Sequence, residues 1–257
     1  MGRHWAPLRR IARRAGFDLV RPGKPPTGLT TLESCLATAL AAQGTLSIVQ
    51  IGANDGLHGD PLDRFICAHR SQLSCVFIEP QRQPLSVLRE HHGDAAGFEY
   101  LQVAVGGPGV LTLYSVAEKA WPFLKIPYAQ PSWPDYRAPS GITSPNREHV
   151  RAWLDRHYSG EAGVETLIEA HEIACLSLPE VIEAVGWAHG PDVVQIDTEG
   201  HDDEVVYACS IGLYHPLLIN YEHVHLSSDR RQRLEDLLTN HGYRLVDTGE
   251  DTLAVRW

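Results

Sequence analysis

Ser47-Ile48-Val49-Gln50-Ile51-Gly52-Ala53-Asn54-Asp55-Gly56 sets the architecture of this chain. An apolar, β-branched run ends there in a turn of small residues, and a segment with helical periodicity follows from Gly59. This pattern predicts a buried parallel strand that leads into a ligand-binding loop and then into a helix. Gly52 and Gly56 favour such a loop, because glycine adopts positive φ freely and lets a ligand approach the backbone.

A second apolar strand supports this interpretation. Val76-Phe77-Ile78-Glu79-Pro80 has a carboxylate at its end, and Glu79 lies 23 residues after Gly56. In nucleotide-binding βαβ units, an acid about 20 residues beyond the glycine loop binds a ribose hydroxyl. The two segments together favour a cofactor that contains a nucleoside.

Strands and helices alternate along most of the chain. Helical periodicity covers residues 31–42, 59–69, 84–92, 148–157, 178–185 and 228–241. Strand patterns cover residues 47–51, 73–78, 98–105, 110–115, 172–176, 192–196, 217–221, 243–247 and 252–256, the last two as an antiparallel pair. Such alternation predicts an α/β fold with a mostly parallel sheet and helices on both of its faces.

The chain divides into an N-terminal segment, a main domain and an insert. Residues 1–44 contain a basic helix, at 3–16, and a helical extension, whereas residues 45–257 form the main domain. The alternation breaks at about residues 118–163, where three tryptophans, three tyrosines and six prolines occur. Aromatic residues are scarce in disordered segments, so this aromatic and proline-rich insert predicts a packed lid over a site.

The composition is that of a globular protein, with 257 residues of which 43% are hydrophobic and 21% charged. No apolar run approaches the roughly 20 residues of a membrane-spanning helix, and the N-terminus lacks the apolar core of a secretory signal. We therefore expect a cytoplasmic protein. Its five cysteines are scattered without a CxxC pair, which favours buried thiols over a zinc site.

Charge is unevenly distributed. The chain has a net charge of −10, but residues 1–24 contain seven basic side chains and one acidic side chain. The rest of the chain is therefore strongly acidic, which argues against nucleic acid as the main partner. The basic residues 3–24 either contact anionic lipid at a membrane surface or another polyanion, or form a solvated helix.

Acidic and histidine side chains collect at the ends of predicted strands. Glu79 ends one strand, Asp197 and Glu199 follow another, and Glu222 ends a third. Ligands bind at the carboxyl ends of the strands in an open α/β sheet, so we expect these acids to share a site. Three histidines lie in the same turns, namely His201, His223 and His225.

The motifs, taken in order, resemble the FkbM family of S-adenosylmethionine-dependent methyltransferases. The resemblance rests on Gln50-Ile-Gly-Ala-Asn-Asp-Gly56 with Asp60-Pro61, Phe77-Ile-Glu-Pro80, Val103-Ala-Val-Gly106, Ile142-Thr-Ser144 with Arg147-Glu148-His149, Ile196-Asp-Thr-Glu-Gly-His-Asp202, Tyr221-Glu-His223 and Asp251-Thr-Leu-Ala254. It covers about residues 46–255. It implies a class I methyltransferase (Rossmann-like) sheet of seven strands with the last antiparallel, and O-methylation of a sugar, glycan or natural product.

The resemblance also implies roles for individual residues. The cofactor S-adenosylmethionine would be bound by Gln50, Gly52, Ala53, Asn54, Gly56, Glu79, Pro80, Ala104, Val105 and Asp197. The acceptor would be bound by Ser144, Arg147, His149 and Glu199. The family's first strand commonly ends in an acid where this chain has Gln50, so the contact with the cofactor's amino-acid end is expected to differ here.

Methylation of a hydroxyl needs a route for its proton. A histidine base suits neutral pH, and the candidates are His201, His223 and His225, with Asp197 and Glu222 as further catalytic residues. The alternative is a metal ion such as Mg²⁺, for which the candidate ligands are Asp197, Glu199, Glu222 and His223.

Two other functions stay open on the sequence. A nicotinamide-dependent dehydrogenase would have glycine at positions 52, 54 and 57, where this chain has Gly52, Asn54 and Leu57. A non-catalytic nucleotide-binding module would share the glycine loop, but the row of acids and histidines argues against it. The sequence identifies neither the small-molecule or glycan acceptor nor whether the chain forms a homo-oligomer.

Overall fold

The computed structural model describes residues 30–256 of the chain. The predicted basic helix at 3–16 and the proposed lipid or polyanion contact of residues 3–24 lie outside the described residues. The described part begins with α2 (Thr30–Gln43), which matches the predicted helical extension.

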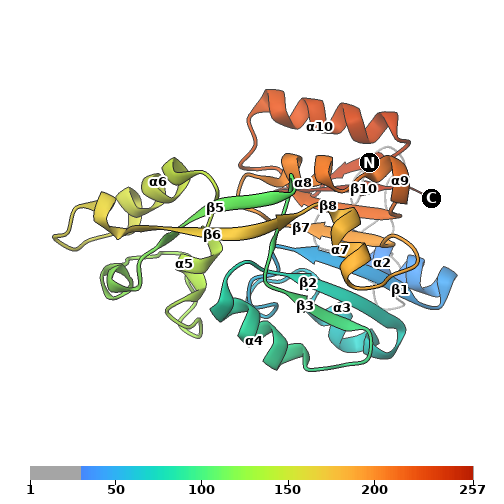
Figure 1. The fold of residues 1–257 in the computed structure, drawn as a ribbon, viewed down its shortest axis with the longest axis horizontal. Coiled ribbons are helices and arrows are strands. Elements are labelled where there is room, and N and C mark those ends of the chain that lie inside the picture. The colour runs from blue at the N-terminus through green and yellow to red at the C-terminus, as the bar shows by residue number, and fades with distance from the viewer. Residues whose placement is uncertain (1–29, 257) are drawn as a thin grey trace, which may run out of the picture.

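A seven-stranded sheet forms the centre of the molecule (Figure 1). Its strands are β1 (Leu46–Ile51), β2 (Leu73–Ile78), β3 (Phe98–Leu101), β7 (Val193–Ile196), β8 (Leu218–Glu222), β9 (Arg244–Asp247) and β10 (Asp251–Val255). They lie in the order β3-β2-β1-β7-β8-β10-β9. Six of the strands run in one direction, and β10 runs in the opposite direction. The chain places β2 and β3 on one side of β1 and the later strands on the other, so the switch point lies between β1 and β7.

This strand order defines a class I methyltransferase-like fold. Counted along the chain, the seven strands lie in the order 3-2-1-4-5-7-6, and only the seventh is antiparallel. The fold predicted from the alternation and from the family resemblance is therefore confirmed. In sheets of this kind the ligand crevice lies outside the carboxyl ends of the strands at the switch point.

Helices cover both faces of the sheet, as predicted (Figure 1). One apolar cluster joins the sheet to α2, α3 (Asp63–His69) and α4 (Arg82–His92). The other joins it to α7 (Leu178–Ala184), α8 (Asp202–Ala208), α9 (Ile211–Tyr214) and α10 (Ser228–Asn240). Successive strand residues alternate between the two, with Ile48 in the first and Val49 in the second.

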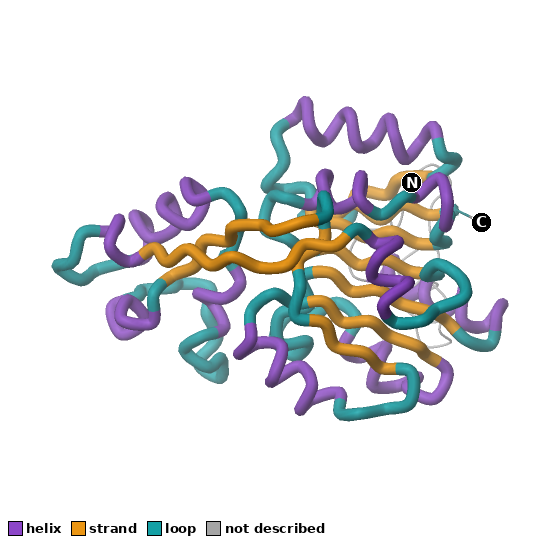
Figure 2. The backbone as a smooth tube through the Cα atoms, viewed as in Figure 1, coloured by secondary structure: helices purple, strands orange, loops and turns teal. Residues whose placement is uncertain are grey.

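Residues 109–176 form an arm that projects from the central sheet (Figure 2). Its long hairpin consists of β5 (Gly109–Val116) and β6 (Ile168–Leu176), and the short β4 (Ala104–Val105) pairs with β6. Between the hairpin strands lie η2 (Glu118–Phe123), α5 (Arg137–Gly141), α6 (Arg147–His157) and η3 (Val164–Leu167). The arm has its own apolar core around Val150, Trp153 and Leu154, so the insert is packed.

Most predicted elements differ from the structure by only one or two residues at their ends, but three differ more. The strand expected at 98–105 is two strands in two sheets, because the chain leaves β3 after Leu101 and pairs with β6 from Ala104. The helix expected from residue 59 begins at Asp63, since the Asp60 carboxylate accepts from the backbone N–H groups of Leu62 and Asp63. The strand expected at 172–176 begins at Ile168.

The remaining described helix is the short η1 (Arg70–Gln72), which follows α3. Across residues 30–256, no helix combines the length and the apolar character that crossing a membrane requires.

Candidate active site

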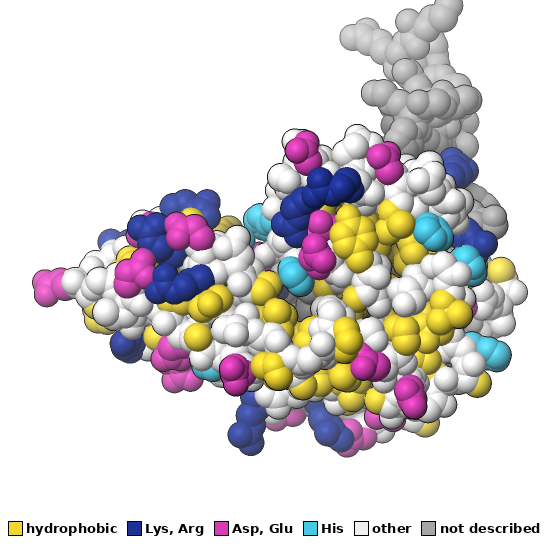
Figure 3. All heavy atoms as spheres, turned by 45° about the horizontal axis from the view of Figure 1, so that its top comes forward, with side chains coloured by type: hydrophobic (Ala, Val, Ile, Leu, Met, Phe, Trp, Pro, Cys, Tyr) yellow, Lys and Arg dark blue, Asp and Glu magenta, His cyan; other side chains and the backbone are white. Residues whose placement is uncertain are grey.

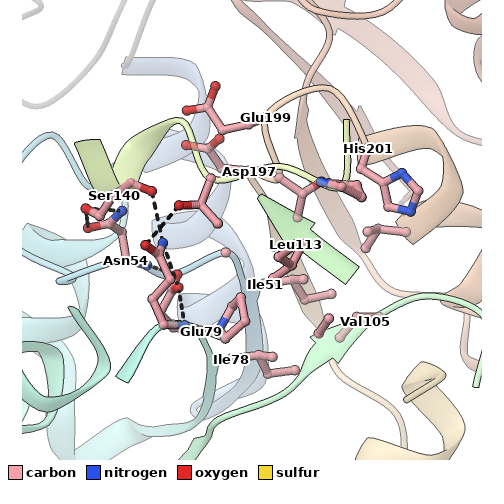
Figure 4. A pocket seen from close by; sticks show the side chains of 18 of the residues that line it. Ile51, Asn54, Ile78, Glu79, Val105, Leu113, Ser140, Asp197, Glu199 and His201 are labelled. Carbon is pink, nitrogen blue, oxygen red and sulfur yellow. Dashed lines mark hydrogen bonds between the residues drawn. The ribbon is translucent and has the colours of Figure 1, made fainter. Parts of the chain in front are cut away.

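A crevice of roughly 700 Å³ opens at the carboxyl ends of β1, β2 and β7, where the fold predicts a ligand (Figure 4). Its polar side is formed by Asn54, Glu79, Ser140 and Asp197. Its apolar side is formed by Ile51, Ile78, Val105 and Leu113. A few polar groups in a largely apolar wall are typical of small-molecule sites. Figure 3 shows the molecular surface hollowed between the arm and the body.

Gly52 lets the ends of β1 and β7 approach each other. Its φ is +74°, and a Cβ atom there would lie 1.8 Å from the Asp197 carbonyl oxygen. Its backbone N–H donates to the carbonyl of Ile78 at 2.9 Å, which joins the loop to β2 as well. Only glycine fits this position, so the three strand ends that surround the crevice depend on it.

Glu79 is buried at the end of β2 and faces the loop. Its carboxylate accepts from the backbone N–H of Asn54 at 2.9 Å and from that of Gln81 at 2.8 Å. Burial raises the pKa of Glu79 to about 7, although these backbone donors favour its ionised form. Each carboxylate oxygen has two lone pairs, so acceptor capacity remains for a ligand in the crevice.

The arm closes one side of the crevice through α5. Tyr136 donates its hydroxyl to Asp55 at 3.2 Å, and the Arg137 guanidinium donates to the carbonyl of His58 at 2.7 Å. Ser140 exchanges hydrogen bonds with the Asn54 side chain at 3.1 and 3.2 Å. The insert is therefore tied to the glycine loop itself, and its residues line the same crevice as Glu79.

The glycine loop adjoins a second, smaller hollow of roughly 320 Å³. Gln50, Ala53 and Gly56 line this hollow, whereas Gly52 and Asp197 line both hollows. The Gln50 amide donates to the Asp60 carboxylate at 2.6 Å, and burial raises the pKa of Asp60 to about 6. Gln50 thus holds the partly buried carboxylate of Asp60 beside the glycine loop.

Carboxylates crowd the carboxyl ends of β7 and β8. Desolvation, followed by the charge of Glu199, raises the pKa of Asp197 above its usual range, although the residue is exposed to solvent in the crevice. Burial, and then the charges of Asp197 and Glu199, raise the pKa of Glu222 to about 10. The positive charge of Arg137 lowers the pKa of Asp197, but the three neighbouring carboxylates of Glu199, Asp202 and Asp251 raise it. Ionised acids repel one another at this edge, so the site favours a cationic ligand, whose charge would stabilise their ionised forms.

Two histidines meet the acids of this edge. The Nε2 atom of His225 lies 3.5 Å from Glu222 Oε2 and 3.6 Å from Glu199 Oε2. His149, from α6 of the arm, places its Nε2 atom 3.5 Å from the same Glu199 oxygen. Burial lowers the pKa of His225 even beside these carboxylates, so its imidazole is available as a proton acceptor at neutral pH.

The structure brings most of the predicted cofactor residues together. Gly52, Asn54, Glu79, Pro80, Ala104, Val105 and Asp197 all line the larger crevice. Glu199 and His201 line it too, and burial lowers the pKa of His201.

Three predicted site residues lie elsewhere. The ring of His223 is buried, with its Nδ1 atom 2.9 Å from the Thr252 hydroxyl, so it does not join the Glu199–Glu222–His225 group. Arg147 is exposed and forms an ion pair with Glu165 on the arm (compare Figure 3, where basic and acidic side chains adjoin over the arm). Ser144 is buried and donates to the carbonyl of Glu199, so it shapes the site without facing a ligand.

Sequence reasoning missed several lining residues. Gln81, Arg137, Ser140 and Thr143 all line the crevice, and Thr143 donates to the Gln81 side chain at 2.9 Å. Three of the four belong to the insert, where no regular pattern indicated which side chains turn inward. Only Gln81 had a signal in the sequence: it directly follows Glu79-Pro80, at a strand end where polar residues are candidates for the ligand site.

The fold and the crevice together define a class I methyltransferase-like protein with a candidate cofactor site. No protein-family model matches the sequence, and no curated protein matches it. The FkbM resemblance therefore rests on the order of the motifs alone.

Several solved structures show partial likeness to this chain. The ribosomal protein L11 methylase from Lactobacillus delbrueckii subsp. bulgaricus is 10% identical, with 87% of this chain and 76% of that chain covered, at a TM-score of 0.36. The rRNA methyltransferase aviRa from Streptomyces viridochromogenes is 12% identical, with 92% and 87% covered, at 0.37. A chain of a fibrillarin/Nop5p complex is 10% identical, with 87% and 81% covered, at 0.38. These scores are low, so the assignment of the fold rests on the strand order.

Proposed function

We propose that this protein is an S-adenosylmethionine-dependent O-methyltransferase acting on a hydroxyl of a sugar, glycan or natural product. The observation that supports it most is the joint crevice of Gly52, Glu79 and Asp197 at the switch point of a class I sheet. In the proposed complex, the Glu79 carboxylate accepts from the ribose hydroxyls. The apolar side with Ala104 and Val105 contacts the adenine.

The charge of the crevice fits this cofactor better than a dinucleotide. S-adenosylmethionine has a sulfonium cation, whereas NAD has a pyrophosphate that would meet Asp197 and Glu199. The smaller hollow beside Gln50 and Gly56 offers room for the amino-acid end of the cofactor. The acids that line it are Asp55, Asp197 and Asp60, and Gln50 holds Asp60 in place.

A hydroxyl acceptor must lose its proton as the methyl group moves, and we propose His225 as the base. Its neutral imidazole takes the proton, and the Glu199 and Glu222 side chains at 3.6 and 3.5 Å orient the ring and stabilise its charged form. His201 is the competing candidate because it lines the crevice itself, whereas His225 reaches it only through its contact with Glu199. The arm, through α5 and His149, excludes water from this edge.

Metal assistance is the second candidate mechanism, and one observation favours it. One oxygen each of Glu199 and Glu222 and one ring nitrogen of His225 lie within 4.8 Å of one another. Two carboxylates and an imidazole fit Mn²⁺ or Fe²⁺ better than Mg²⁺, which prefers oxygen ligands only. Such an ion would lower the pKa of a bound hydroxyl. Asp197 and His223, which the sequence also suggested as ligands, are not in this group.

The experiment that tests the proposal uses isotope-labelled S-adenosylmethionine and a panel of glycans and hydroxylated metabolites. Mass spectrometry should find a gain of one labelled methyl group on an oxygen of at least one acceptor. His225→Asn should lower turnover by roughly 100-fold or more, while His189→Asn, at an exposed loop, leaves it unchanged. If His201→Asn abolishes turnover and His225→Asn does not, the base is His201. Loss of activity with a chelator, restored by Mn²⁺, would favour the metal mechanism.

A further inference from the structure

Four potential metal ligands meet on the far side of the sheet from the arm's hairpin, where α3 packs beside the end of α4 (Figure 1). They are Asp63 and Cys67, one helical turn apart on α3, and His91 and His92, the last two residues of α4. One ligand atom from each of the four lies within 4.8 Å of the other three. The cluster shares no residue with the proposed active site.

The contacts within the cluster are direct. His91 Nε2 lies 2.7 Å from Asp63 Oδ1, and Cys67 Sγ lies 3.3 Å from the same oxygen. The rings of His91 and His92 have their centroids 4.7 Å apart. The set is therefore one sulfur, two imidazole nitrogens and one carboxylate oxygen, which is the mixture that tetrahedral Zn²⁺ sites use. A thiolate and a carboxylate would together balance the two charges of the ion.

An independent observation at His92 also indicates a ligand. The side chain is 0% exposed, yet neither of its ring nitrogens has a hydrogen-bond partner. Buried polar atoms nearly always have a partner, and an unpaired one in a native structure calls for an unseen water or ion. The ring cannot easily turn away, because it stacks on Phe77 with an interplanar angle of 14° and a centroid distance of 5.0 Å.

We propose that Asp63, Cys67, His91 and His92 form a binding site for Zn²⁺ or a similar thiophilic divalent ion. The ion would join α3 to the end of α4. The site is structural, since all four protein ligands fill a tetrahedral shell.

The site also lies under the glycine loop of the crevice. A Cβ atom on Gly56 would come within 3.3 Å of His92 Nε2 and within 2.0 Å of a Leu88 methyl group, so the loop rests directly on the end of α4. An ion that fixes His92 would therefore fix the surface on which the loop packs. This proposal does not depend on what the crevice binds.

The test is Co²⁺ and Zn²⁺ binding to the full-length, metal-stripped chain. We expect one tightly bound Zn²⁺ per chain by elemental analysis after dialysis, a rise in melting temperature, and a thiolate-to-cobalt charge-transfer band with Co²⁺. Cys67→Ser, at an exposed position, should lose that band and weaken Zn²⁺ binding by more than about tenfold. Cys35→Ser is the matched control and should keep both.

The spectrum separates this site from the proposed active site, which contains no sulfur. His225→Asn should leave the charge-transfer band intact, whereas His91→Asn should remove or shift it. Two results would overturn the proposal: binding of clearly less than one Zn²⁺ per chain when the metal is added back and the protein is dialysed, or a Cys67→Ser variant that binds Zn²⁺ as the wild type does.

Discussion

At the scale of single residues, Gly52 decides whether the crevice can form. A Cβ atom at this position would lie 1.8 Å from the Asp197 carbonyl oxygen, so there is no room for a side chain. Relief would require β1 and β7 to separate at the point where both contribute to the site. The backbone conformation, with φ at +74°, adds strain for any other residue.

Gly52→Ala should therefore destabilise the protein by about 3 kcal/mol, from backbone strain and overpacking together. Urea unfolding followed by circular dichroism measures this. Gly107→Ala is the matched control, because no atom lies within 4 Å of the added Cβ and its φ is not positive. Equal stability of the two variants would show that the loop has another conformation in solution.

The protonation of Glu79 predicts a pH-dependent affinity for S-adenosylmethionine. Burial raises the pKa of this carboxyl to about 7, so it is largely protonated below that pH and accepts ribose hydrogen bonds poorly. Affinity should therefore increase from about pH 6 to about pH 8, and the increase should be shallower in Glu79→Gln. Calorimetric titrations across this range are the measurement. Parallel profiles for wild type and variant would assign the dependence to another group, of which Asp197 is the first candidate.

At the scale of elements, α5 is the part of the arm that matters most for the crevice. Arg137 donates through both Nε and an Nη atom to the carbonyl of His58, at 3.1 and 2.7 Å, and so holds the helix against the glycine loop. Arg151, on α6 of the same arm, forms only exposed ion pairs, with Glu148, Asp155 and Glu165. The two arginines thus allow a matched comparison.

Arg137→Ala should weaken cofactor binding by about tenfold, equivalent to roughly 1.4 kcal/mol. Arg151→Ala should leave it unchanged, because surface ion pairs contribute little. Fluorescence or calorimetric titration with S-adenosylmethionine distinguishes the two. If neither substitution alters the affinity, α5 contacts only the acceptor.

The sequence predicted elements well where burial imposes a pattern. The second strand was predicted at 73–78 and occupies those residues, since both of its faces are buried and all of its residues except Ser74 are apolar. The arm's β6 was predicted four residues too short, although Ile168-Glu169-Ala170-His171 alternates apolar and polar residues; these four residues pair with β5 in the arm, outside the central sheet. Pattern reasoning also joined β3 to β4, as nothing local marks the change of sheet between Leu101 and Ala104.

The candidate site was harder to predict residue by residue. Strand ends identified Glu79, Asp197 and Glu199, because the fold brings such ends together. The sequence could not show which of two alternating histidines, His223 or His225, faces the acids. Nor could it show that Glu165, 18 residues away, pairs with Arg147 outside the site. The ligand set of Cys67 and His92 was also missed, since it depends on how two helices pack.

At the scale of the whole molecule, the accumulation of carboxylates predicts how stability varies with pH. Folding raises the pKa of Glu222 to about 10, and those of Glu79 and Asp202 to about 7. Above the pKa of these groups in the unfolded chain, the native state binds more protons, so rising pH lowers the free energy of unfolding. Histidines with lowered pKa, such as His92 at about 4, have the opposite effect, but only below about pH 6.5.

The melting temperature of the ligand-free protein should therefore fall as the pH rises from about 6.5 to about 9. Differential scanning calorimetry over this range measures it. Glu222→Gln should flatten the decline, because the glutamine has no charge to desolvate. A melting temperature that rises with pH in this interval would show that the carboxylates are paired by cations in solution.

The central claim is that the crevice between β1, β2 and β7 binds S-adenosylmethionine through Glu79. Isothermal titration calorimetry at about pH 8, where Glu79 is ionised, tests it most directly. Wild type and Glu99→Gln, which alters an exposed carboxylate on the adjacent β3, should bind the cofactor equally, and NAD should give no heat. Glu79→Gln should bind at least about tenfold more weakly, because it loses charge-assisted hydrogen bonds to the ribose. Absence of binding to the wild type, or equal affinity in Glu79→Gln, would contradict the account.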